Sequence, residues 1–593
     1  MCGVGVFSLL FIWGTDALAL TCNSNGGGTW NAVARWSCGR VPLAVDDVFV
    51  LNGHTVTIDT AALAQTVTVN TGGILRFATG TARSLTVNNA GAQGNITVQT
   101  GATLDVDPAS NVTHTLTAVG NIANAGTFNL APDANSLCDT TFSRNGNQTL
   151  SGAGGTTRFN RITVDMGATD ANILDVTATN FAMAAAGYLT IVDGTFRLST
   201  NVTIAPFDAD PGLPNGSNGK VIPANGRFWL NSAGATVNVS VAASDYNLTF
   251  DGGTLQITSG TMNIGDASDT RLRFTNTAGS AFTMDGGALN ISGRWTSVNA
   301  TDSVIYNQSG GTLTVGTVGN SLATFGPFFL GSGASSSFTM SGGSIAIVRV
   351  STAGADEYDN RAPTSNVTGG TVQIGNASTP AGQNFGIDTV PPVWDLVINN
   401  TNSPTATIQA ALTVRDDVTI NTGATLNANN LNISVGNGNA SGNWTNSGTF
   451  TAGTGTVTFT GTSATATIGG TAATTFNNFT INKASNNLTI ATTPTINGAL
   501  TFTSGDIVTG ANRVILGTAA TVATPSAASY VFGTVQKNYA AAGTLTFPVG
   551  DASNYTPVVI QGTAGFTAGN LAISTTGTDH PQVTTPIAST GID

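Results

Sequence analysis

One short segment of the sequence brings acids and a base close together. Asp356, Glu357 and Asp359 stand beside Arg361. Enzymes that cleave glycans on parallel β-helices use pairs of aspartates, Ca²⁺ and a basic residue on one outer face. The segment is therefore a candidate site for a polysaccharide lyase or a glycoside hydrolase. The alternative, which we favour, is a solvated loop whose acids carry out no chemistry.

A second group of acids lies in a long loop rich in Pro, Gly and Asn. Asp208 and Asp210 begin this loop, Asn215 follows, and the loop runs to Lys220. Carboxylate and amide oxygens are the ligands that Ca²⁺ accepts, so this is a weak candidate Ca²⁺ site, and we expect no other cofactor. The ligand set is incomplete, and a solvated loop is again the alternative. The pair Asp416-Asp417 precedes a strand and is interpreted as turn or edge residues.

Cysteine and histidine offer little further chemistry. Cys22 and Cys38 enclose a loop of about 15 residues, and in an oxidising compartment we expect them to form a disulfide. Two buried thiols are the alternative. Cys138 is left over and is expected to be a buried or unpaired thiol. The three histidines lie far apart in the sequence, and no pair has the spacing of metal ligands, which argues against a histidine metal site (His54, His114, His580).

The elements that would position these residues are strands of a repeating coil. A phrase with two glycines, followed by alternating apolar and polar residues, recurs along the chain, as in Asp251–Ile257 and Ser341–Ile347. Such a phrase predicts a turn that tolerates positive φ and then a strand with alternating faces. The second glycines of five phrases are separated by 34, 24, 32 and 27 residues, which suits three-sided coils with variable loops (Gly253, Gly287, Gly311, Gly343, Gly370).

Composition supports an all-β solenoid. The chain has 593 residues, of which 8% are charged, and it contains 73 glycines. Polar positions are filled by Thr, Asn, Ser and Asp, which favour strands and turns, so we expect almost no helix. The net charge of −12 reflects a scarcity of bases and argues against nucleic acid and against docking on anionic lipids.

Four segments follow from these patterns. An apolar stretch followed by Ala17-Leu18-Ala19 predicts a signal peptide over residues 1–19. Residues 20–60, with Trp30 and Trp36, form an expected N-terminal cap that includes the disulfide. Residues 61–515 are the predicted solenoid repeats. Residues 516–593 are a predicted C-terminal β-rich module, a small β-sandwich-like cap, and we expect the natural polypeptide to continue beyond Asp593.

The two ends of the repeat region resemble a known family. The opening, from Thr29-Trp30 to Asp59 and including Trp36–Pro42, and the stretch from Phe476 to Ile560, are similar to large secreted bacterial β-helix proteins of the adhesin and autotransporter-passenger type. The resemblance implies a right-handed parallel β-helix at the cell surface. It supplies no catalytic residue.

We therefore expect a secreted or cell-surface structural and adhesive protein, a rigid stalk whose polar faces make multivalent contact with glycans or with cell-surface and matrix components. It would be extracellular, with no direct membrane span and no nucleic-acid partner. A polysaccharide lyase or glycoside hydrolase is one alternative. Ice binding is another, because threonines alternate along one segment, but neighbouring coils do not clearly repeat this array (Thr454, Thr456, Thr458, Thr460, Thr462).

Overall fold

The fold, taken from a computed structural model, is a parallel β-solenoid of about 20 turns, with 53% of its residues in strands. The structure describes residues 18–88, 94–184, 188–207, 221–239, 247–265, 268–319, 324–352, 354–400, 402–437, 440–462, 465–563 and 568–577. Within these ranges the one helical element is the 3₁₀ turn η1 (Val33–Arg35). The predicted all-β solenoid is confirmed. Asp208, Asp210, Asn215, Lys220 and most of the predicted signal peptide lie outside the described residues.

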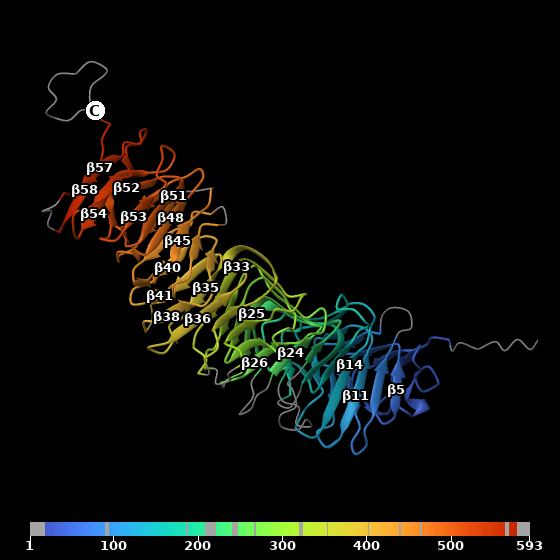
Figure 1. Cartoon of the computed structure of the whole chain (residues 1–593). Coiled ribbons are helices and arrows are strands. Elements are labelled where there is room, and N and C mark those ends of the chain that lie inside the picture. Colours follow the sequence, from blue (N-terminus) through green and yellow to red (C-terminus); the bar gives the residue numbers. More distant parts are fainter. Residues whose placement is uncertain are drawn as a thin grey trace, which may run out of the picture. The chain divides into compact units, whose positions relative to one another are not determined.

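The chain divides into two compact units, one up to Pro206 and one from Phe207. In each unit, strands of successive coils lie side by side and pair in parallel, and the coils have three faces (Figure 1). The three-sided coil predicted from the glycine spacing is therefore present. Among the described residues, no helix is long and apolar enough to cross a membrane.

In the first unit, each face is a row of short parallel strands. The first row contains β1 (Thr21–Asn23), β3 (Asp47–Val50), β6 (Thr66–Val69), β9 (Ile96–Val98), β12 (Ile122–Asn124), β15 (Gln148–Ser151), β18 (Ile173–Val176) and the end of β20 (Leu189–Leu198). The second contains β2 (Gly28–Thr29), β4 (Thr55–Ile58), β7 (Ile74–Phe77), β10 (Thr103–Val106), β13 (Thr127–Asn129), β16 (Thr156–Phe159) and β19 (Phe181–Met183). The third contains β5 (Ala61–Ala64), β8 (Ser84–Val87), β11 (Thr113–Ala118), β14 (Leu137–Phe142), β17 (Ile162–Asp165) and the start of β20, and the short strand β21 (Thr203–Ile204) follows.

In the second unit, one row runs through β22 (Val221–Pro223), β24 (Asn247–Asp251), β26 (Arg271–Phe274), β29 (Arg294–Ser297), β32 (Phe328–Leu330), β34 (Tyr358–Asn360), β36 (Asn384–Thr389), β38 (Thr405–Ile408), β41 (Thr425–Asn427) and β44 (Thr449–Thr451). A second row is β39 (Leu412–Val414), β42 (Ile433–Val435), β45 (Thr456–Phe459), β48 (Asn478–Asn482), β51 (Ala499–Ser504) and β53 (Thr521–Ala523).

The remaining strands of these coils belong to one large sheet. They are β23 (Gly226–Val239), β25 (Thr254–Ile264), β27 (Ala281–Met284), β28 (Ala288–Ile291), β30 (Ile305–Gln308), β31 (Thr312–Val315), β33 (Ser337–Ile347), β35 (Thr364–Ile374), β37 (Asp395–Ile398), β40 (Val418–Ile420), β43 (Trp444–Asn446), β46 (Ala466–Gly469), β47 (Thr475–Phe476), β49 (Leu488–Ile490), β50 (Thr495–Ile496) and β52 (Ile507–Leu516). Long strands such as β33 bend at a Gly-Gly pair and so contribute to two faces, because the register shifts there without ending the strand.

The core follows from the period of two within each strand. In β4, β7 and β10, the buried residues Val56, Leu75 and Leu104 lie at matching positions of successive coils. Within each strand, the residues on either side of the buried one face outward. In the second unit, buried aromatic rings stack in the same way. Trp295 and Phe328 have ring centroids 6.3 Å apart, and Phe328 and Tyr358 have centroids 5.2 Å apart, at small interplanar angles. Each coil therefore buries its apolar residues on its neighbours.

The N-terminal segment already belongs to the stack, since β1 pairs in parallel with β3. Cys22 of β1 forms the expected disulfide with Cys38, with a Cα–Cα distance of 4.9 Å. Beside it, Trp30 and Trp36 are buried, pack edge to face at 4.9 Å, and the Nε1 of Trp36 donates to the carbonyl of Trp30. Bulky aromatics and a disulfide thus hold the first coil together.

The C-terminal strands combine parallel and antiparallel pairing. β54 (Val531–Tyr539) pairs in parallel with β52 and with β56 (Val549–Gly550), and in antiparallel with β58 (Gly569–Ile573). β55 (Thr544–Phe547) pairs in antiparallel with β57 (Val558–Gln561). Antiparallel pairs are thus present at this end, but the predicted β-sandwich-like cap is not confirmed.

Candidate functional sites

The acidic segment near residue 356 is built on two neighbouring coils. Asp359 in β34 is in register with Asp388 in β36, and both face outward. Arg361 joins them, since its Nε donates to Asp359 Oδ1 at 2.6 Å and its Nη2 donates to Asp388 Oδ2 at 2.5 Å. The predicted grouping of Asp359 with Arg361 is therefore found. Asp388 was missed, although its separation of 29 residues from Asp359 is close to the length of one coil.

Glu357, two residues before Asp359, is only 3% exposed. Its Oε1 accepts from the backbone N–H of Ser351 at 2.9 Å, and its Oε2 accepts from that of Gly386 at 2.5 Å. Burial, with a smaller contribution from Asp356, raises the pKa of Glu357 to about 7. Such a pKa would suit a general acid. However, the carboxylate is enclosed and both oxygens hold backbone amides, which is the arrangement of a structural group.

The other acids of this segment are also only partly hydrated. Burial raises the pKa of Asp359 to about 6, against the opposing effect of Arg361. Burial and the nearby Asp388 raise the pKa of Asp356, whose carboxylate lies against Gly386. Retaining and inverting glycosidases need two carboxylates that face a sugar from opposite sides. Here the carboxylates face Arg361 or backbone amides, and the cluster chiefly ties one coil to the next.

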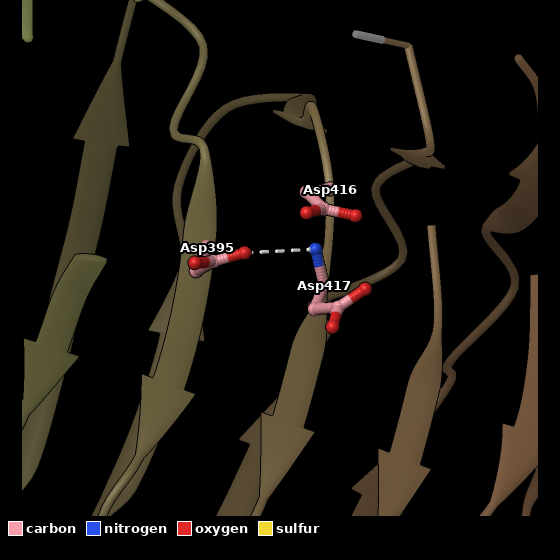
Figure 2. Close-up of side chains that lie close together, drawn as sticks. All are labelled: Asp395, Asp416 and Asp417. Carbon is pink, nitrogen blue, oxygen red and sulfur yellow. Dashed lines mark hydrogen bonds between the residues drawn. The ribbon is translucent and has the colours of Figure 1, made fainter. Parts of the chain in front are cut away.

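A second acidic cluster lies where strands begin. Asp395 at the start of β37 and the pair Asp416-Asp417 just before β40 place their carboxylate oxygens within 4.8 Å of one another, and all three are half-buried (Figure 2). The Oδ1 of Asp395 accepts from the backbone N–H of Asp417 at 3.1 Å. The sequence placed Asp416 and Asp417 correctly before a strand. It did not predict their partner, which comes from the preceding coil.

These aspartates belong to a ladder of side-chain-to-backbone hydrogen bonds. Asp417 Oδ1 accepts from the N–H of Asn443 at 2.8 Å, and Asn443 Oδ1 accepts from the N–H of Thr467 at 3.0 Å. Asp395, Asp417 and Asn443 thus occupy the same position in three successive coils. In the first unit, Asn95 and Asn121 make the same kind of contact with the coil that follows. An asparagine oxygen is therefore sufficient for the ladder, and the negative charges are additional.

The ionised form of these aspartates is destabilised by its surroundings. Burial, together with Asp416 and Asp417, raises the pKa of Asp395 to about 6. The pKa of Asp417 is also raised, chiefly by burial. Within the described ranges, no ion pair includes these three residues. Carboxylate oxygens at this spacing could ligate a cation such as Ca²⁺, but three residues fall short of the six to eight ligands that it usually takes.

One cavity near the C-terminal strands holds about 730 Å³. The charged residue in its lining is Lys537. The Nζ of Lys537 donates to the carbonyls of Gly517, Thr518 and Ala520 at 2.7 to 3.1 Å. Burial lowers the pKa of this lysine. The amine of Lys537 is therefore engaged by three carbonyls.

Rows of hydroxyl side chains run along the outer faces. In the first unit, five threonines face outward from β8, β11, β14, β17 and β20, each in register with the next (Thr86, Thr117, Thr141, Thr163, Thr190). In the second unit, β39, β42, β45, β48 and β51 supply a matching row (Thr413, Ser434, Thr458, Thr480, Thr501). Paired strands lie about 4.8 Å apart, so the hydroxyls repeat at that spacing.

The second row changes our interpretation of the threonine-rich segment. Neighbouring coils do repeat Thr458, contrary to our expectation, because each contributes one hydroxyl at the same register. The row is hidden in the sequence because the intervals between its members vary from 21 to 24 residues. The adjoining outward column is mixed, however, with Asn432, Thr456 and Asn478 at successive positions. The regular array is therefore one residue wide.

Comparison with known proteins assigns no family to this geometry. A scan against protein-family models and searches of curated proteins and of solved structures each give no match for this chain. The expected likeness to bacterial adhesins and autotransporter passengers is supported by the structure for the β-solenoid fold and its repeats only. Function has to be argued from the arrangement of the residues themselves.

Proposed function

We propose that this chain is a secreted or cell-surface structural protein, a β-solenoid stalk whose outer faces adhere to glycans or to matrix components. The observation that carries the proposal is the pair of in-register hydroxyl rows, five coils long in each unit (Thr86 to Thr190, and Thr413 to Thr501). Such rows offer the same hydrogen-bonding group again and again along the coil axis.

The mechanism is multivalent contact. A single exposed hydroxyl adds little affinity, because it exchanges a bond to water for a bond to the ligand. A chain of repeating sugar units can meet several hydroxyls of one row at once, and the later contacts are then intramolecular. The backbone hydrogen bonds between strands hold the rows in fixed register. Binding therefore costs little conformational entropy.

The disulfide supports an extracellular location. Disulfides form and persist in oxidising compartments and are rare in the cytosol. Cys22 and Cys38 close such a bond directly after the predicted signal peptide. Export therefore accounts for both the apolar leader and the bonded cysteines.

The test is a binding screen of the full chain on immobilised neutral and acidic polysaccharides. A fivefold Thr→Val variant of the first-unit row removes the hydroxyls and keeps the branched shape. We expect this variant to bind markedly more weakly, with the remaining affinity carried by the second-unit row, whereas each single Thr→Val change lowers binding less than about twofold. Matched Thr→Val changes on another face of the same unit serve as control (Thr103, Thr127, Thr156).

Two results would overturn the proposal. Binding that does not change in the fivefold variant would exclude the hydroxyl row as the adhesive surface. Release of new reducing ends or unsaturated products, abolished by Asp359→Asn, would favour the lyase or hydrolase alternative.

Ice binding is a second candidate, favoured by the same observation. Regular hydroxyl rows on a rigid sheet can order water, and the rows here extend over five coils in each unit. The freezing hysteresis of a dilute solution tests this function. Hysteresis that vanishes in the fivefold Thr→Val variant would support it, and its absence in the unaltered chain would exclude it.

A further inference from the structure

Three arginines surround a small cavity on the outer face of the second unit. Arg271 and Arg273 in β26 and Arg294 in β29 line a space of about 140 Å³, together with Thr296, Ser297, Val298, Thr324 and Phe325. The whole chain contains 19 Lys and Arg residues against 31 Asp and Glu residues. A concentration of three bases around one cavity is therefore unusual for this molecule.

The strand register creates the grouping. Arg271 is paired with Arg294, and Arg273 is paired with Thr296, on strands about 4.8 Å apart. Arg271 and Arg273 are two residues apart and so lie on the same face of β26. The four side chains form a compact block on two coils, which brings positive charges together from positions that are 21 to 23 residues apart in the sequence.

Arg273 lies where a positive charge is poorly stabilised. Burial and the neighbouring Arg271 lower the pKa of Arg273, and only Asp302 acts in the opposite direction. The Nε of Arg273 is buried and makes no hydrogen bond. A buried charged donor without an acceptor is costly, and an oxyanion in the cavity that Arg273 lines would offset the repulsion between the guanidinium groups.

The rest of the lining limits what can bind. Thr296 and Ser297 add hydroxyl groups to the lining. Each hydroxyl already donates to a backbone carbonyl, at 3.3 and 2.6 Å, and would have to rotate to donate to a ligand. Phe325 packs its ring on Phe329 at 4.0 Å and forms an apolar wall. The cavity is small compared with the usual pocket for an organic ligand, which suits an oxyanion.

We propose that this cavity binds the oxyanion of an acidic glycan, a carboxylate or a sulfate group. Guanidinium groups match both geometries with two parallel hydrogen bonds, and the apolar wall beside them suits the face of the sugar ring that carries the group. The inference rests on the proposed adhesive function and specifies its ligand class. Because the chain carries a net charge of −12, a polyanion is repelled by the molecule at large and needs a local positive site of this kind.

The experiment measures binding of small probes to the full chain by calorimetry at low ionic strength, with chloride as the only competing anion. The probes are sodium sulfate, a monouronate, its parent neutral hexose and a sulfated disaccharide. We expect the uronate and the sulfated disaccharide to bind and the neutral hexose not to bind. Arg273→Gln is expected to lower the affinity for both at least about tenfold, because charge-assisted bonds to the anion are lost.

Two further variants control for charge and for folding. Arg513→Gln removes a surface arginine whose Nη1 donates to Gln536, far from the cavity in sequence, and should bind both probes as the unaltered chain does. Arg273→Lys keeps the positive charge but loses the planar guanidinium that can donate two parallel hydrogen bonds. This variant should therefore have an intermediate affinity. An unchanged midpoint of thermal unfolding shows that each variant is folded.

The outcomes separate this inference from the adhesive function. Equal affinity in Arg273→Gln and the unaltered chain, or no binding of either glycan probe, would overturn the anion site while polysaccharide adhesion through the hydroxyl rows could still be observed. Binding of sulfate alone would reduce the cavity to an inorganic anion site and contradict the glycan assignment. Uronate binding that depends on Arg273, without any adhesion to polysaccharide surfaces, would support the cavity and contradict the stalk's adhesive function.

Discussion

Asp395, Asp417 and Asn443 perform the same structural task with different charges. Each offers a side-chain oxygen to the backbone N–H of the next coil. The two aspartates have raised pKa values, because ionised carboxylates are poorly solvated beside one another and beside Asp416. The cost of the charge can therefore be separated from the benefit of the hydrogen bond by changing Asp to Asn, which keeps the acceptor.

We predict that Asp395→Asn stabilises the protein at pH 7 and has no stabilising effect at pH 4. The folded-state pKa of about 6 lies above the ordinary value of 3.8, so the native state holds this proton more tightly than the unfolded state. Stability is then lost as pH rises between these values. Allowing for solvent screening of a half-exposed group, the gain in unfolding free energy at pH 7 is about 1 kcal/mol. Urea unfolding at both pH values measures it.

Asp285→Asn is the matched control, because Asp285 is exposed and its oxygen accepts from Ser309, as an asparagine oxygen also can. Its unfolding midpoint should be unchanged at both pH values. If added Ca²⁺ raised the midpoint of the unaltered chain and not that of Asp395→Asn, the three carboxylates would be cation ligands and the purely structural role would be wrong.

Glu357 should act as a structural acceptor and not as a catalyst. Glu357→Ala removes the acceptor for the N–H groups of Ser351 and Gly386 and leaves both buried. We expect a loss of about 2–3 kcal/mol in unfolding free energy. Glu357→Gln keeps one acceptor and should lose less. Chemical unfolding of the two variants tests this, and a folded, fully stable Glu357→Ala protein would refute it.

At the scale of elements, the sequence predicts the strands and their bends but not which residues pair between neighbouring coils. Alternation and the Gly-Gly pairs predict the strands and their bends, because both depend on neighbouring residues. The partners across coils depend on register, and loops of unequal length hide it. Asp388 beside Asp359, Asp395 beside Asp417 and the row through Thr458 were therefore not predicted, although each pair lies one coil apart. The disulfide was predictable because its cysteines are close in sequence.

The bends themselves can be tested at Gly343. Its φ of +75° is one that residues with a Cβ rarely adopt, and a Cβ there would lie 2.5 Å from the carbonyl oxygen of Gly310 in the preceding coil. We predict that Gly343→Ala lowers the unfolding free energy by about 2–3 kcal/mol, from backbone strain and from displaced coils. Gly382→Ala has a similar φ of +71° and meets nothing within 4 Å, so it should show only the strain. Equal losses of unfolding free energy in the two variants would show that contact with the preceding coil does not restrict position 343.

At the scale of the whole molecule, stability should be distributed coil by coil. Each coil packs on its immediate neighbours, so a local loss weakens adjacent coils more than distant ones. The bond between Cys22 and Cys38 holds only the first coil of its unit. Its removal should therefore free the strands at that end and leave later coils intact, whereas a molecule with one shared core would weaken throughout.

We predict that replacing both Cys22 and Cys38 by serine increases amide hydrogen exchange in β1 and β3 and leaves β15 and β18 of the same unit unchanged. Closing a loop of this size contributes about 3 kcal/mol in the chain-entropy model, and the stacked coil next to it limits how far fraying spreads. Cys138→Ala is the control, because this buried thiol lies in β14 and its loss should raise exchange in β11 and β17 instead. Faster exchange in every strand of the unit after loss of the disulfide would mean that the coils unfold as one cooperative block, and that stability is a property of the whole unit.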